Sequence, residues 1–155
     1  MIYPAKSSLV TIPKVEIWQG HIPRRVLNLN PERVFIYPSA EYSRHGNSAA
    51  ADLYGEFNSY AIPYRRINGR YNNPLWTDDT YITNVDKIDK AFNCIPRDKI
   101  WVIPSSCFRM PVAERVAPQT IGYLKIKIEK LKRGARIVRL SEWWATGKPQ
   151  EKERL

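Results

Sequence analysis

Side chains that could bind a phosphate-bearing ligand and act on it gather in one loop, residues 39–48. Glu41 could serve as a base or as a nucleophile toward a ribose-type carbon, and His45 could carry a proton near neutral pH. Arginine binds phosphate in a bidentate fashion, and hydroxyl and amide groups add neutral hydrogen bonds. The loop supplies four such ligand-binding candidates, Ser39, Arg44, Asn47 and Ser48.

Two further polar loops, residues 65–79 and 104–118, hold side chains of the same kinds. They add Arg65, Ser105 and Ser106 to the candidates for phosphate binding. Each of these residues has an ordinary alternative role, either as a solvated surface group or as the cap of a helix. No glycine-rich phosphate loop accompanies them, which counts against a common dinucleotide or nucleoside triphosphate enzyme.

Short apolar runs and helical periodicities alternate along the chain and define the elements that would position these loops. Strands are expected at 34–37, 59–64, 100–103 and 135–140. Pro63 places the second of them at an edge of the sheet, and the apolar sequence of the third places it in the middle. Helices are expected at 49–57, 79–92 and 118–133. Thr77 or Asp78 could cap the second helix, and Gly134 follows the third as its C′ residue.

The alternation of strands and helices is typical of right-handed crossover units, so the predicted fold class is α/β. We expect a three-layer sandwich with a mostly parallel sheet of about four to five strands, flavodoxin-like or Rossmann-like, in a single domain. Residues 33–146 would form the α/β domain, between a proline-rich arm or edge strands at 1–32 and a charged flexible tail at 147–155. Within the arm, residues 14–18 alternate as a half-buried edge strand does. Parallel strands end at one edge, so the three polar loops would meet at the carboxyl edge, where ligands bind in such folds.

The strand, polar loop and helix expected over residues 33–60 resemble in shape those of small nucleotide-handling α/β domains, such as the nucleoside deoxyribosyltransferases and TIR-like domains. The loop in question carries Gly46, Asn47 and Ser48 just before the expected helix. The resemblance implies an α/β fold that handles a nucleotide-type ligand, and it transfers no functional residue to this chain.

The charge of the chain favours a polyanionic partner. Its 25 Lys and Arg residues outnumber 15 Asp and Glu residues, which gives a formal net charge of +10. Such a surplus suits nucleic acid, a nucleotide or an anionic membrane surface. The alternative is a soluble protein whose basic character serves no particular partner.

Several other classes of protein are disfavoured. No apolar run approaches the roughly 20 residues that span a bilayer, so no membrane partner is expected. Prolines at positions 4 and 13 make the N-terminus a poor signal peptide, so we expect a cytoplasmic protein. Cys94 and Cys107 lack the spacing of a zinc site and are expected to be free, buried thiols. The sequence predicts no metal and no cofactor.

A second group of candidates is basic. Residues 125–139 hold seven cations and a single acid, Glu129. Lys127, Lys130 and Arg133 are the candidates for contact with a nucleic-acid backbone, and the alternative is a solvated helix face. Bases could stack on Trp76 and on the pair Trp143-Trp144, although adjacent tryptophans near a chain end could equally pack on the core.

Two functions fit these patterns best, and a protein–protein module that uses Trp143 and Trp144 is a third alternative. The first is a small basic protein that binds a nucleotide or nucleic acid at the carboxyl edge of its sheet, with hydrolase or glycosyl-transfer-type activity on that ligand. The second is a non-catalytic component of a nucleoprotein or viral assembly that binds nucleic acid. The sequence leaves open whether the protein is an enzyme and whether it forms a homo-oligomer.

Overall fold

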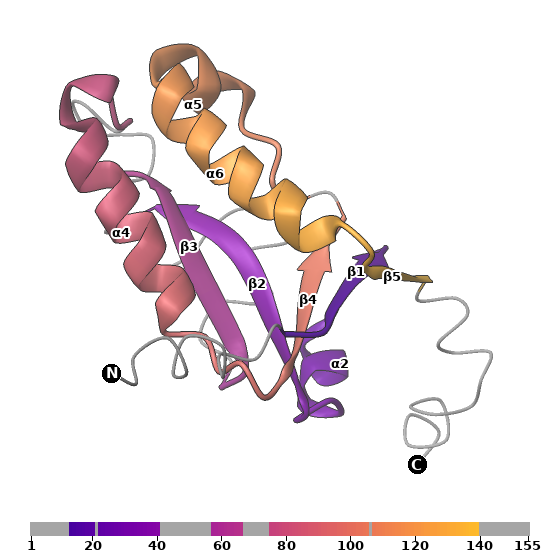
Figure 1. The fold of residues 1–155 in the computed structure, drawn as a ribbon. Coiled ribbons are helices and arrows are strands. Elements are labelled where there is room, and N and C mark those ends of the chain that lie inside the picture. Colours follow the sequence, from indigo (N-terminus) through magenta and orange to yellow (C-terminus); the bar gives the residue numbers. More distant parts are fainter. Residues whose placement is uncertain (1–12, 21, 41–56, 67–74, 106, 140–155) are drawn as a thin grey trace.

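Five strands in the order β3-β2-β4-β1-β5 form the sheet at the centre of the structure, and every neighbouring pair is parallel (Figure 1). The structure is a computed structural model that describes residues 13–20, 22–40, 57–66, 75–105 and 107–139. The strands are β1 (Val15–Gln19), β2 (Arg33–Ala40), β3 (Ser59–Arg65), β4 (Ile100–Pro104) and β5 (Arg136–Arg139). The predicted α/β fold class is confirmed, and the arrangement is consistent with a flavodoxin-like or Rossmann-like single domain.

Two predicted strand positions are confirmed, and a third is wrong. β4 lies in the middle of the sheet, and β3, which contains Pro63, lies at an edge. β1 lies between β4 and β5 and not at the expected edge. The alternation of Glu16 with apolar neighbours indicated a face open to water. Glu16 is in fact buried, because its charge is paired with Arg33.

Three helices cover one face of the sheet, namely α4 (Tyr81–Asn93), α5 (Pro111–Val116) and α6 (Pro118–Lys132). The helices α4 and α6 lie side by side on this face (Figure 1). Ile121, Leu124 and Ile128 of α6 form one core with Ile36 of β2 and Trp101 of β4. The apolar residues that recur at helical spacing along α6 therefore form the face that the helix buries.

The opposite face of the sheet packs against α2 (Arg24–Asn28). Val26 and Leu27 of this helix form a second core with Phe35, Tyr37 and Val102. Successive residues of a strand point to opposite faces, so the β2 and β4 residues in this core alternate with those that face α4 and α6. Helices on both faces give the expected three-layer sandwich.

Both short helices occupy stretches that we expected to be irregular. The helix α5 begins at Pro111 inside the loop expected at 104–118, and α2 begins directly after Pro23 in the proline-rich arm. A proline at the start of a helix loses no hydrogen bond, and its fixed φ suits the helix. These prolines therefore mark the starts of helices and not breaks in structure.

The C-terminal end of α6 leads directly into β5. Gly134 follows the helix with φ of +72°, a left-handed conformation that favours glycine. This confirms the predicted C′ position and turns the chain into β5 at Arg136, so the end of α6 lies at the amino edge of the sheet.

Candidate nucleic-acid interface

Most residues predicted for the carboxyl edge lie outside the described part of the chain, namely Glu41, Arg44, His45, Asn47, Ser48 and Ser106. The other three lie near the ends of three different strands: Ser39 in β2, Arg65 in β3 and Ser105 just after β4. Ser39 is buried, and Ser105 is exposed, with its backbone N–H donating to the Trp18 carbonyl at 2.9 Å.

Arg65 lies over the ring of Tyr64, with its guanidinium carbon 5.4 Å from the ring centroid. The last residues of the five strands are Gln19, Ala40, Arg65, Pro104 and Arg139. None of these residues is a carboxylate or an imidazole. The last residues of the five strands therefore offer no acid or base for catalysis.

At the N-terminal end of α6 a carboxylate of the protein takes the place where an anion would bind. Asp78, in the short 3-10 helix Asp78–Thr80, accepts hydrogen bonds from the backbone N–H groups of Gln119 and Thr120 and from the Thr120 hydroxyl, each at 2.9 Å. The expected caps at Thr77 or Asp78 are wrong for α4, because no side chain caps that helix. Asp78 caps α6 instead. Helix N-termini bind phosphate in many α/β folds, but these two N–H groups are already satisfied.

Partial burial raises the pKa of Asp78, but the hydrogen bonds from Gln119 and Thr120 outweigh that effect and hold the pKa below its usual 3.8. A buried amide supports the arrangement. Asn84 of α4 donates to the Thr77 carbonyl at 2.9 Å and to the Thr120 hydroxyl at 3.2 Å, so it joins α4, α6 and the segment that holds Asp78. This end of α6 is a closed structural network.

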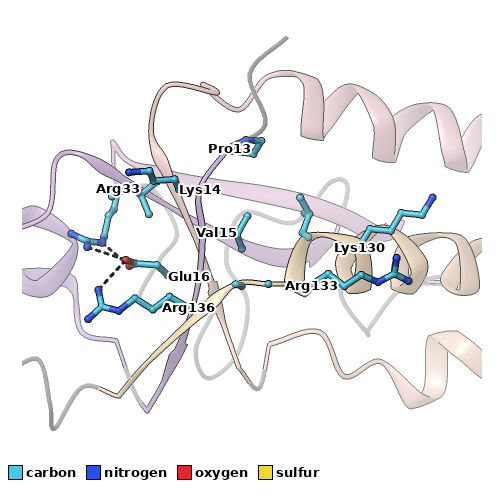
Figure 2. Close-up of a pocket in the computed structure, with 12 residues that line it drawn as sticks. Pro13, Lys14, Val15, Glu16, Arg33, Lys130, Arg133 and Arg136 are labelled. Atoms are coloured by element: carbon cyan, nitrogen blue, oxygen red, sulfur yellow. Dashed lines mark hydrogen bonds and ion pairs between the residues drawn. The ribbon is translucent and has the colours of Figure 1, made fainter. Parts of the chain in front are cut away.

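A basic hollow lies at the opposite, amino edge of the sheet (Figure 2). We call it the amino-edge hollow. It has a volume of about 580 Å³ and is formed by the starts of β1, β2, β4 and β5 together with the C-terminal end of α6. Its lining contains one acid, Glu16, and five basic residues, Lys14, Arg33, Lys130, Arg133 and Arg136.

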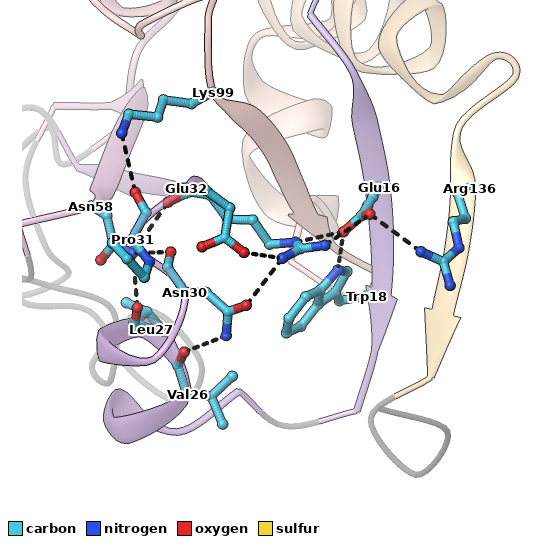
Figure 3. Close-up of polar contacts among 11 residues, drawn as sticks. Glu16, Trp18, Val26, Leu27, Asn30, Pro31, Glu32, Asn58, Lys99 and Arg136 are labelled. Atoms are coloured by element: carbon cyan, nitrogen blue, oxygen red, sulfur yellow. Dashed lines mark hydrogen bonds and ion pairs between the residues drawn. The ribbon is translucent and has the colours of Figure 1, made fainter. Parts of the chain in front are cut away.

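Glu16 is held by the side chains of Arg33, Trp18 and Arg136 (Figure 3). Its Oε1 accepts from Arg33 Nε at 2.9 Å and from Trp18 Nε1 at 2.8 Å, and its Oε2 accepts from Arg33 Nη2 at 3.2 Å. Arg136 Nη1 lies 3.7 Å from Oε2. Burial raises the pKa of Glu16, but these hydrogen bonds and the charges of Arg33 and Arg136 outweigh it and keep the pKa below 4.5. The carboxylate is therefore ionised at neutral pH.

The guanidinium of Arg33 is fixed from several directions (Figure 3). Besides Glu16, it donates to Asn30 Oδ1 at 3.1 Å and to Glu32 at 2.6 Å, and it lies 5.6 Å from the Trp18 ring centroid. Asn58 ties down the same turn, because its amide nitrogen lies 2.9–3.2 Å from three backbone carbonyls between α2 and β2. The charge of Arg33 is thus largely balanced inside the protein.

The other cations of the hollow differ from Arg33. Lys14, Lys130 and Arg133 form no ion pair with any described residue. Figure 2 shows Lys130 and Arg133 on the side of β1 opposite Glu16. Positive charge in the hollow therefore exceeds what its single acid can balance.

Lys127, the third predicted nucleic-acid contact, does not line the hollow. Its Nζ lies 3.0 Å from Asp89 Oδ1, 5.7 Å from the Phe92 ring centroid and 5.4 Å from the Tyr123 ring centroid. Tyr123 donates to Asp89 at 2.7 Å as well. Lys127 thus belongs to the contact between α4 and α6, and its neighbour Lys130 belongs to the hollow.

Sequence reasoning missed Lys14 and Arg33 as members of this surface, and it counted Arg136 only as part of the basic run 125–139. Lys14 directly precedes β1, whereas Arg33 and Arg136 begin β2 and β5. Glu16 pairs with both arginines, and the register of β1 and β5 places Glu16 opposite Arg136. A weak signal exists in the sequence, since each of the three cations directly precedes a β-branched residue. The pairing that unites them is a long-range property.

Two other expectations are corrected. Trp76 is 6% exposed within the core, so it offers no free ring for base stacking, whereas Trp143 and Trp144 lie outside the described residues. Both cysteines are free, as predicted, but Cys94 is exposed and not buried. Burial raises the pKa of the Cys107 thiol to about 11, so it is protonated and unreactive at neutral pH.

Searches over the described residues find no group of side chains that could hold a metal ion. They also find no helix with the length and apolar character needed to cross a bilayer. No family model, curated protein or solved structure is significantly similar to this chain. Its function must be inferred from the charges and contacts of its own residues.

Proposed function

We propose that this protein binds nucleic acid, without acting on it chemically, through the phosphates that contact the amino-edge hollow. One observation carries the proposal: Lys14, Lys130 and Arg133 line the same hollow and form no ion pair with a described residue. Like charges held close together repel one another, and a bound polyanion relieves this repulsion. Lys and Arg side chains that neutralise phosphates release counterions from the nucleic acid, which supplies most of the affinity in such complexes.

A purely structural explanation covers only part of this charge. Cations near the C-terminal end of a helix interact favourably with its dipole, which explains Lys130 and Lys132 in the last turn of α6. The same reason does not apply to Lys14, which precedes β1 and forms no ion pair with a described residue. Arg136, which begins β5, is accounted for in part by Glu16 Oε2 at 3.7 Å. The hollow gathers cations from separate parts of the fold, as expected of a surface that binds an anion.

Neutralising two of these cations tests the proposal. We expect Lys130→Gln/Arg133→Gln to lower the affinity for a labelled nucleic acid at least roughly tenfold at about 0.1 M salt, measured by fluorescence anisotropy. The matched control is Lys90→Gln/Arg115→Gln, which removes the same charge from exposed positions of α4 and α5 outside the hollow. Equal losses in both variants would show that net charge matters and that the hollow does not.

A second candidate function is the binding of a nucleotide at the carboxyl edge. The sheet order favours it, because the chain leaves β2 toward β3 on one side and leaves β4 toward β5 on the other. Ligands of open α/β sheets bind at such a switch point. If Glu41 acts there as a nucleophile or base, Glu41→Gln abolishes turnover and leaves ligand affinity nearly intact. An unchanged rate would remove this catalytic assignment.

A further inference from the structure

We infer that the ligand of the amino-edge hollow is double-helical nucleic acid, recognised through its phosphates without reading of the base sequence. This inference rests on the proposed function and names the class of ligand. Three features of the hollow lead to it, namely the absence of aromatic and amide side chains from its lining, the polarity of the helix end that it includes, and the position of its cations on two sides of β1.

The described lining of the hollow contains no aromatic ring and no amide side chain. Proteins that bind single strands stack bases on exposed aromatic rings, and sequence readers combine amide and guanidinium groups at base edges. Apart from the six charged residues, the lining consists of Pro13, Val15, Ile100, Leu131, Gly134 and Ala135. The nearby Trp18 ring is 0% exposed and lies against Arg33. A single strand would therefore gain no stacking energy from this surface.

The hollow also lacks the features of a mononucleotide site. Such sites hold phosphate with the N–H groups of a helix N-terminus or with a bidentate arginine. Here α6 presents its C-terminal end, which offers no free N–H groups to a phosphate. The Arg33 guanidinium is already bound to both oxygens of Glu16, and Arg136 Nη1 lies 3.7 Å from the same carboxylate. The side chains of Lys14, Lys130 and Arg133 are exposed, so they attract phosphate without enclosing it.

The cations occupy both sides of β1, and this favours an extended ligand. Figure 2 shows Lys130 and Arg133 on one side of the strand and Lys14 on the other side with Arg33. Recognition by charge alone favours the ligand with the higher charge density. Duplex DNA carries one charge per about 1.7 Å of its axis, about twice the linear density of one strand. For three neutralised phosphates the expected salt slopes are about −2.7 for duplex and about −2.1 for single strands.

The test compares the binding of a labelled duplex with that of each of its separate strands. We expect the duplex to bind roughly fourfold more tightly at about 0.1 M salt, with the steeper salt slope. Affinity should be the same for duplexes of shuffled sequence, and a mononucleotide at equal phosphate concentration should not compete. DNA and RNA duplexes are measured separately, because both present two rows of phosphates. Lys130→Gln/Arg133→Gln should lower the affinity for every duplex, whereas Lys90→Gln/Arg115→Gln should not.

Each other outcome has a definite meaning. Equal or tighter binding of the single strand, a strong dependence on sequence, or displacement by the mononucleotide would overturn the inference and leave nucleic-acid binding intact. Duplex binding that Lys130→Gln/Arg133→Gln does not weaken would overturn the assignment to the hollow. No binding of any nucleic acid would overturn both this inference and the proposed function.

Discussion

The two ends of α6 deal with charge in opposite ways. At the N-terminal end, the acid Asp78 places all three of its hydrogen bonds on α6 itself, and Asn84 joins the same network from α4. At the C-terminal end, Glu16 pairs with Arg33 and Arg136, but Lys14, Lys130 and Arg133 line the same hollow and form no ion pair with a described residue.

This contrast separates charges that stabilise the fold from charges that are available to a ligand. A hydrogen-bonded acid at a helix N-terminus satisfies backbone N–H groups and complements the dipole. The unpaired cations of the hollow repel one another, and the α6 dipole offsets this repulsion at Lys130 but not at Lys14. The charge at the N-terminal end of α6 therefore stabilises the fold, whereas the unpaired charge at the C-terminal end indicates a binding partner.

The largest expected effect on stability comes from Glu16→Ala. The side chains of Glu16 and Arg33 are 9% and 15% exposed, so removing the acid leaves a mostly buried cation with only the exposed Glu32 as an acidic partner. We expect the free energy of unfolding to fall by about 3 kcal/mol, measured by urea denaturation. Glu16→Gln keeps an acceptor for Trp18 and Arg33 and should lose less. A loss below about 1 kcal/mol for Glu16→Ala, as for a surface pair, would contradict this structural role.

Asp78→Ala should have the next largest effect. It removes the acceptor of two backbone N–H groups and of the Thr120 hydroxyl at the start of α6. The expected loss of unfolding free energy is about 1–2 kcal/mol, as for other helix caps. Nucleic-acid affinity should not change, because Asp78 lies at the opposite end of α6 from the hollow. A large change in affinity without a change in stability would show that the N-terminal end of α6 contributes to binding and not to the stability of the fold.

The contribution of Asp78 should depend on pH in a defined direction. Because its folded pKa lies below the ordinary 3.8, the carboxylate stabilises the fold above that pH and loses this effect as the pH falls through the folded pKa. The difference in unfolding free energy between the wild type and Asp78→Asn should therefore be constant near neutral pH. It should shrink toward zero below about pH 4. A difference that persists in acid would mean that the negative charge of Asp78 contributes nothing.

The smallest effects on stability should distinguish Lys127 from Lys130, which both lie in α6. Lys127→Gln removes an ion pair with Asp89 and contacts with two rings, and should cost about 0.5–1 kcal/mol. Lys130→Gln should change the unfolding free energy by less than about 0.5 kcal/mol and weaken nucleic-acid binding. The reverse pattern would move the binding surface to the face shared by α4 and α6.

Much of the fold could be predicted because local signals agreed with the tertiary structure. The apolar run 100–103 is the central strand, Pro63 marks an edge, and the stripe through Ile121 and Leu124 is the buried face of α6. The errors arose where a residue has a partner that is distant in the sequence, because a local pattern cannot include that partner. Glu16 made β1 resemble an edge strand because its partner, Arg33, is 17 residues away.

The candidate site was only partly predictable. The basic run 125–139 identified Lys130 and Arg133, but it could not separate them from Lys127, whose role depends on Asp89 of a different helix. Arg136 joins the hollow through a strand register that links it to Glu16, 120 residues earlier in the chain. Register of this kind follows from packing of the whole sheet, so no local pattern reveals it.

The salt dependence of duplex binding tests the central claim most directly. Wild-type protein and Lys14→Gln/Lys130→Gln/Arg133→Gln are compared by the slope of log affinity against log salt concentration, between about 50 and 200 mM salt. If the three cations each neutralise a phosphate, the slope becomes shallower by about 2.7, and the unfolding free energy stays nearly the same. An unchanged slope in a folded variant would show that phosphates do not contact the amino-edge hollow.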